Sequence, residues 1–136
     1  MPRELKYVER CSGANHNDEA WIAYVDTSKS GRTVYFNQKA FIRASGLVTG
    51  NHLDVDDHAE FWISGVKKRG SNRHWAGSGK ILIERTAVSE YLQLTGLPSL
   101  DETRFEIVDP FPPVDEAEFH EYFNRPWAND EPDDAV

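Results

Sequence analysis

Residues 21–44, WIAYVDTSKSGRTVYFNQKAFIRA, carry the pattern that decides the fold. The first residues alternate between the two faces of an expected strand, with Trp21, Ala23 and Val25 on one face and Ile22 and Tyr24 on the other. The SKSG segment at 28–31 predicts a turn, and residues 32–37 return as a second strand. Another tight turn is expected at 37–39, before a strand over 40–44. The stretch therefore predicts a β-hairpin followed by a third strand.

Short strands of the same kind recur along the chain, between turns rich in Gly, Asn, Asp and Ser. Besides the three above, the expected strands are 4–11, 52–55, 60–68 and 80–84, and strand character returns at 104–109. Six or seven short strands at this spacing favour a mainly β fold, either a small antiparallel barrel or a strongly bent sheet. Residues 1–109 are therefore expected to form one β-rich domain.

Helices are expected only late in the chain. Residues 87–95 have apolar residues at helical spacing, and we expect Thr86 to cap the start and Gly96 to end the helix. Residues 110–125 predict a stiff, proline-rich connector and a second short helix. Residues 126–136 are acidic and lack periodicity, which predicts a disordered tail.

Charge is distributed unevenly along the chain. The formal net charge is −8 over 136 residues. Residues 101–136 contain 12 acids and 2 bases, whereas residues 1–100 contain 13 bases and 11 acids. The body is therefore mildly basic and the C-terminal third strongly acidic, and such an asymmetry indicates charged partners.

Composition favours a cytoplasmic protein. A membrane-spanning helix needs roughly 18 consecutive apolar residues, and the chain has no such run, so no membrane partner is expected. The charged residues 1–10 lack the apolar centre of a secretory signal. Cys11 is the one cysteine and cannot form an internal disulfide, which fits a reducing compartment. No cofactor is expected.

Residues 62–80, WISGVKKRGSNRHWAGSGK, combine cations, aromatic rings and glycines without a single acid. A site for a phosphate-bearing or otherwise anionic partner needs this combination. The candidate ligand-binding residues are Lys67, Lys68, Arg69, Arg73, His74 and Trp75. We expect the cations to contact phosphates and the Trp75 ring to stack on a base or an aromatic ligand. The ordinary alternative is a solvated loop, with Trp62 in the core.

Two apparent motifs are excluded by their spacing. GSGK at 77–80 lacks the earlier glycine of a phosphate-binding P-loop, because position 74 is histidine, and a strand is expected after Lys80. HLDVDDHAE at 52–60 matches neither a calcium-binding EF-hand nor the zinc motif HExxH, so no metal site is expected. Asp56 and Asp57 are instead expected to form a turn between two strands.

The chain resembles a family of small, uncharacterised bacterial proteins, above all in FWISGVKKRGSNRHWAGSGKI at 61–81. Shorter segments continue the resemblance: 20–22, 28–37, 50–55, 90–97 and 105–109. The family usually has Tyr at Phe61 and Asp at Asn72, and often has Gly at Gln38. No established activity comes with the family, so the resemblance implies no catalytic residue. Members sometimes carry a name that implies a thiamine-diphosphate-dependent deoxyxylulose-phosphate synthase, an enzyme class that needs a large α/β scaffold and a diphosphate–metal site. This chain has neither the length nor the motif for that chemistry.

The leading hypothesis from the sequence is a non-enzymatic cytoplasmic binding domain that presents the 67–80 loop to an anionic or protein partner, with nucleic acid or a nucleotide as one candidate ligand. One alternative is a small enzyme acting on a phosphorylated or nucleotide substrate. In that enzyme His74 would act as acid or base, while Lys67, Arg73 and Lys80 would stabilise charge. The other alternative is a protein–protein module that acts through the acidic C-terminal segment.

Overall fold

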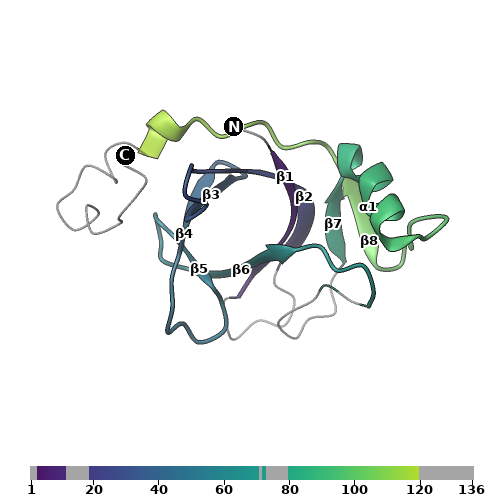
Figure 1. The fold of residues 1–136 in the computed structure, drawn as a ribbon, viewed down its shortest axis with the longest axis horizontal. Helices are drawn as coiled ribbons and strands as arrows, with labels where there is room; N and C mark the ends of the chain where they lie inside the picture. The colour runs from purple at the N-terminus through teal and green to yellow at the C-terminus, as the bar shows by residue number, and fades with distance from the viewer. Residues whose placement is uncertain (1–2, 12–18, 71, 73–79, 120–136) are drawn as a thin grey trace.

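Six antiparallel strands form a closed barrel in the computed structural model of the chain, which describes residues 3–11, 19–70, 72 and 80–119 (Figure 1). The barrel strands are β1 (Glu4–Arg10), β2 (Ala20–Thr27), β3 (Thr33–Phe36), β4 (Lys39–Arg43), β5 (His52–Asp54) and β6 (Glu60–Gly65). Each strand pairs with the next along the chain, and β6 pairs with β1, which closes the barrel. The predicted small antiparallel barrel is therefore confirmed.

Local turn chemistry sets the order of the strands. The turn between β3 and β4 consists of Asn37 and Gln38, whose φ angles are 53° and 64°. Two consecutive left-handed residues are typical of a type I′ hairpin, whose twist matches the twist of the strands it joins. Gly31, with φ of 79°, ends the turn between β2 and β3, and Asp56 and Asp57 lie in the turn between β5 and β6. All three turns were predicted from the sequence.

Two further strands extend the sheet beyond the barrel. β7 (Ile81–Glu84) pairs with the first half of β2, β8 (Phe105–Val108) pairs with β7, and both pairings are parallel. The last residues of β2 pair with β3, so β2 has two partners along one edge. The sequence predicts these two strands but not their direction. A parallel pair needs a crossover connection, and α1 (Val88–Thr95) lies in the connection between β7 and β8.

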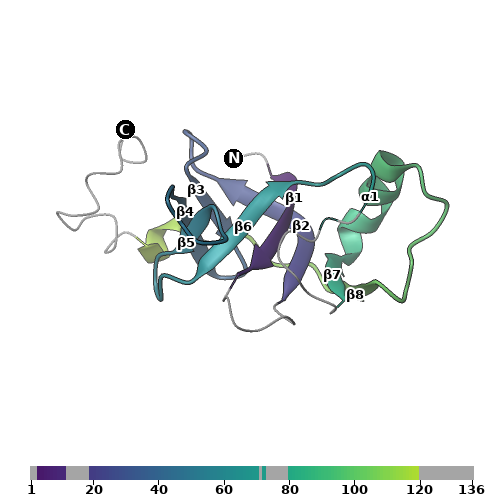
Figure 2. The same ribbon diagram turned by 90° about the horizontal axis from the view of Figure 1, so that it is seen from below.

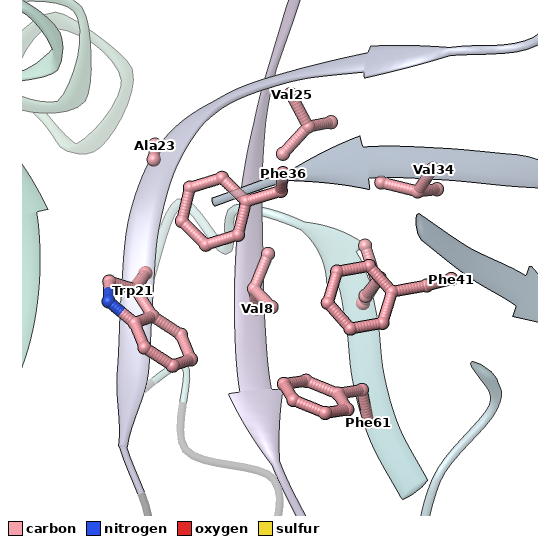
Figure 3. Packing of buried hydrophobic residues seen from close by; sticks show 9 residues of the cluster. Val8, Trp21, Ala23, Val25, Val34, Phe36, Phe41 and Phe61 are labelled. Carbon is pink, nitrogen blue, oxygen red and sulfur yellow. The ribbon is translucent and has the colours of Figure 1, made fainter. Parts of the chain in front are cut away.

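Apolar side chains cover both faces of β1 and β2. The interior of the barrel is filled by Val8, Trp21, Ala23, Val25, Val34, Phe36, Phe41, Phe61 and Ile63 (Figure 3). Outside the barrel, a second cluster packs between β1, β2, β7 and α1: Tyr7, Ala20, Ile22, Ile81, Ile83, Ala87 and Tyr91. The predicted alternation along β2 is confirmed, because successive residues enter the two clusters in turn. Trp62, which was expected in the core, is half-buried and packs against the outer cluster.

A proline-rich strap bridges β7 and β3, the two strands that share one edge of β2. Phe111 packs against the interior cluster, and its ring centroid lies 4.8 Å from that of Phe36. Glu84 at the end of β7 is 1% exposed, and its Oε1 accepts the backbone N–H of Phe111 at 3.2 Å. The stiff connector expected at 110–113 therefore holds an aromatic ring against the barrel core.

The helix α1 ends as predicted but begins differently. Gly96 has φ of 74°, and its N–H donates to the carbonyl of Leu92, as in a left-handed C-cap. The predicted Thr86 cap was wrong. Thr86 lies in a 3-10 turn, η1 (Arg85–Ala87), Ala87 takes the N-cap position, and the Thr86 hydroxyl donates to Glu84 Oε2 at 2.6 Å. The Thr86 hydroxyl therefore donates to the buried carboxylate, and among the described residues no side-chain oxygen accepts a backbone N–H as a cap at the start of α1.

The end of the chain is described only in part. The second expected helix is represented by a 3-10 turn, η2 (Glu116–Phe119), where Phe119 packs against Tyr35 at 6.0 Å between ring centroids. The remainder of that helix and the expected tail at 126–136 lie outside the described residues. Within the described ranges, none of the helices is long and apolar enough to cross a membrane.

Candidate functional site

The barrel has two ends that carry different side chains. The start of β1, the turn between β2 and β3 and the end of β6 lie at one end, at the upper edge of Figure 2. The opposite end is formed by the end of β1, the turn between β3 and β4 and the turn between β5 and β6. We call the first the cationic end, defined by Lys6, Arg43, Lys67, Lys68 and Arg69, and the second the mouth end.

The cationic end holds the first part of the predicted ligand-binding loop. Lys67, Lys68 and Arg69 follow β6 almost directly, and all three are exposed. The Oδ1 of Asn72, a residue 4% exposed, accepts the backbone N–H of Lys67 at 2.7 Å. Among the described residues, no ion pair involves these three cations. The loop therefore presents three solvated cations on a backbone that a buried amide holds in place.

Lys6 and Arg43 add positive charge at the same end. They act on His52, which is 3% exposed and lies opposite Arg43 in the pairing of β4 with β5. Burial, together with the charges of Arg43 and Lys6, lowers the pKa of His52 to about 4. The Lys6 ammonium lies 3.5 Å from the carboxylate of Glu4, which offsets part of its charge. His52 is therefore neutral at pH 7, within an environment that disfavours further positive charge.

Three of the predicted binding residues lie outside the described residues. These are Arg73, His74 and Trp75. Their expected roles in phosphate binding, acid–base chemistry and ring stacking stay predictions. Lys80, at the other end of the same loop, is exposed just before β7, which begins beside the start of β2 at the mouth end. The fold therefore separates the last cation of the loop from the first ones.

A cavity at the mouth end was missed by the sequence analysis. Its volume is about 130 Å³, and four aromatic side chains line it: Trp21, Phe36, Phe41 and Phe61. Each of these side chains is at most 6% exposed. The Trp21 and Phe36 rings pack edge to face with centroids 5.6 Å apart, and Phe41 packs on Phe61 at 4.5 Å (Figure 3). The four rings come from four different strands, so no local sequence pattern connects them.

Charged side chains of both signs line the same cavity. Lys39 Nζ lies 2.9 Å from Oδ2 of Asp54, a residue with 0% exposure. The hydrogen bond to Asp54 raises the pKa of Lys39, and the charge of Asp57 acts in the same direction. Arg10 and Glu19, both exposed, complete the charged rim. The mouth end therefore combines aromatic walls with a rim in which one of the two cations is already paired.

Comparison of the chain with models of protein families, with curated proteins and with solved structures found no match. The resemblance to a bacterial family stays a prediction, and the functions proposed below rest on the geometry and charge of the described residues.

Proposed function

We propose that the chain is a non-enzymatic cytoplasmic binding domain whose cationic end receives an anionic partner. The observation that carries the proposal is the gathering of five cations at one end of a closed barrel, three of them exposed on a loop whose backbone bonds to a buried amide. Solvated cations in such a group raise the local concentration of anions and speed their association. Arg43 and Lys6 also lie close enough to the buried His52 for their charges to lower its pKa, although burial is the larger cause.

A phosphate-bearing chain such as single-stranded nucleic acid is the partner class that this arrangement favours. Consecutive cations along one loop suit a ligand with regularly spaced phosphates, each of which releases counterions when it is neutralised. Stacking of a base on Trp75 would add affinity, and this contact stays a prediction. The enzyme alternative depends on His74 and the protein–protein alternative on the acidic C-terminal segment. Neither gains support from the described residues.

The test is binding of a fluorescently labelled single-stranded oligonucleotide, measured by anisotropy over a range of salt concentrations. The double charge reversal Lys67→Glu/Lys68→Glu should weaken binding by about tenfold or more. It should also make the log–log salt dependence shallower by roughly 1.4, because two phosphate contacts to a single strand are lost.

The matched control is Arg85→Glu/Arg104→Glu, which makes the same change in net charge on exposed residues of the β7–β8 side. A general effect of net charge would weaken binding equally in both double variants, and that result would contradict the proposal. Binding of polyglutamate with the same dependence on Lys67 and Lys68 would support an anion site that does not recognise nucleic acid specifically.

A further inference from the structure

The mouth cavity has the size and walls of a small-ligand site. At about 130 Å³ it is close to an apolar cavity of roughly 150 Å³ that holds one benzene molecule. Its walls are aromatic side chains at one end of the barrel, and its rim is polar. Small-molecule sites typically combine apolar walls with a few convergent polar groups in this way. A ligand with one ring or a branched group of similar size would therefore fit.

The charges around the cavity select the sign of the ligand. Three carboxylates line it, from Glu19, Asp54 and Asp57, against two cations, from Arg10 and Lys39. Lys39 is held by Asp54 at 2.9 Å, so its charge is neutralised within the protein. The exposed rim then carries two carboxylates and one guanidinium. This balance attracts a cation rather than an anion.

The aromatic walls also favour a positively charged ligand. The face of an aromatic ring carries negative quadrupole charge, and it attracts ammonium and guanidinium groups within about 6 Å of the centroid. Four aromatic side chains line the same cavity as the charged rim, so a cationic group at the rim lies near aromatic rings. Walls and rim therefore act together, although they come from separate parts of the chain.

We propose that the mouth cavity binds a small organic cation, an amine or methylated ammonium attached to one apolar or aromatic ring. The ring enters the cavity between the aromatic side chains, and the cationic group stays at the rim near Glu19 and Asp57. This site is independent of the anion site at the cationic end, because it lies at the other end of the barrel and prefers the opposite charge.

The test uses three probes that share a phenyl ring and differ in charge: benzylammonium, benzyl alcohol and benzoate. Binding is followed by the indole N–H resonance of Trp21 in ¹⁵N-resolved NMR spectra, assigned with a Trp21→Phe variant. Trp62, in the outer layer, serves as an internal reference. Benzylammonium should shift the Trp21 signal saturably, whereas benzyl alcohol should bind more weakly and benzoate least.

The variants Glu19→Gln and Asp57→Asn then test the rim. Asp57 Oδ1 accepts the backbone N–H of Ala59 at 2.9 Å, and asparagine retains an oxygen for that bond, so the turn should persist. Each variant should weaken the binding of benzylammonium by about twofold to fivefold and leave the affinity for benzyl alcohol unchanged. Glu106→Gln on β8 is the matched control and should leave the affinity for benzylammonium unchanged. Equal affinity for the three probes, or no shift of Trp21 at any accessible concentration, would overturn the proposal.

Discussion

Acidification below pH 6.5 should destabilise this protein through one buried histidine. His52 is held neutral by burial and by the nearby charges of Arg43 and Lys6, which lower its pKa from 6.5 to about 4. In the unfolded chain the same imidazole titrates near 6.5. As the pH falls, His52 therefore binds a proton in the unfolded chain but stays neutral in the folded chain. The stabilisation is complete above pH 6.5 and is lost progressively until pH 4.

The size of this effect follows from the difference between the two pKa values. Each pKa unit corresponds to about 1.4 kcal/mol, so the total loss is about 3 kcal/mol, of which about 2 kcal/mol is reached by pH 5. The geometry identifies the nitrogen that carries the proton of the neutral ring. Asn51 donates from Nδ2 to the carbonyl of Ile63 and accepts from the Ile63 N–H at Oδ1, both at 2.9 Å. Its Oδ1 also lies 2.8 Å from His52 Nδ1. Because an amide oxygen can only accept, the His52 proton sits on Nδ1.

The assay is urea unfolding of the wild type and His52→Gln at pH 7.5 and pH 5. The free energy of unfolding should fall between these pH values by about 2 kcal/mol more in the wild type than in the variant. Comparing the pH-dependent loss within each protein removes the direct cost of the substitution. Carboxylates such as Glu60, whose pKa is lowered by backbone N–H donors from Thr49 and Gly50, lose their contribution mainly below this pH range.

An identical pH dependence in the two proteins would refute the reasoning about His52. A further check is Arg43→Gln, which removes one of the two charges that act on the ring. It should raise the pKa of His52, measured by NMR titration of the imidazole signals. A pKa that stays constant in Arg43→Gln would show that the charge of Arg43 does not contribute to the value.

Three further predictions concern the strap, a turn and the charge pair in the mouth cavity. Phe111→Ala should lower the free energy of unfolding by about 2 kcal/mol, since a half-buried ring and its aromatic contact are lost. The loss is measured by urea unfolding. A loss no larger than that of Ile107→Ala, at an exposed position, would contradict this prediction. Gln38→Gly should raise the free energy of unfolding by about 0.5–1 kcal/mol, because the φ of 64° at Gln38 is unfavourable for a residue with a side chain and favourable for glycine. A lower Tm of the variant would argue against this prediction. Lys39→Met should lower the free energy of unfolding by about 3 kcal/mol, because the buried Asp54 carboxylate loses its ion-pair partner. Adding Asp54→Asn should restore at least half of that loss in the same urea assay, and an additive double variant would show that the pair is not coupled.

The fold was predictable where a few neighbouring residues determine the conformation. The alternation of Trp21, Ile22 and Ala23 assigns β2 two buried faces, and the structure places them in two separate clusters. The left-handed conformations at Asn37 and Gly96 are local as well, and both end an element where the sequence predicts. These features need no knowledge of distant parts of the chain, because turn and cap geometries involve only a few consecutive residues.

The candidate sites were predictable to different degrees. An acid-free run of cations predicts a surface loop, and the exposure of Lys67, Lys68 and Arg69 agrees with it, while the binding role stays a proposal. The mouth cavity left no comparable signal, since Arg10 and Asp57 approach each other only when β1, β5 and β6 pair. The inward position of His52 was also missed, because its three-residue strand is too short to show an alternation.

Propensity and periodicity act over a few residues, so the sequence alone predicts the short strands, the turns between them and the one late helix. The closure of β6 on β1, the parallel direction of β7 beside β2 and the position of Phe111 along the edge of β2 depend on contacts that form only in the folded chain. Such pairings join residues that are tens of positions apart, and the free energy that selects them comes from burial of whole faces rather than from any local pattern. The charge of the two barrel ends is likewise a product of closure, which brings the cations of two strands and one loop to the end opposite the aromatic cavity.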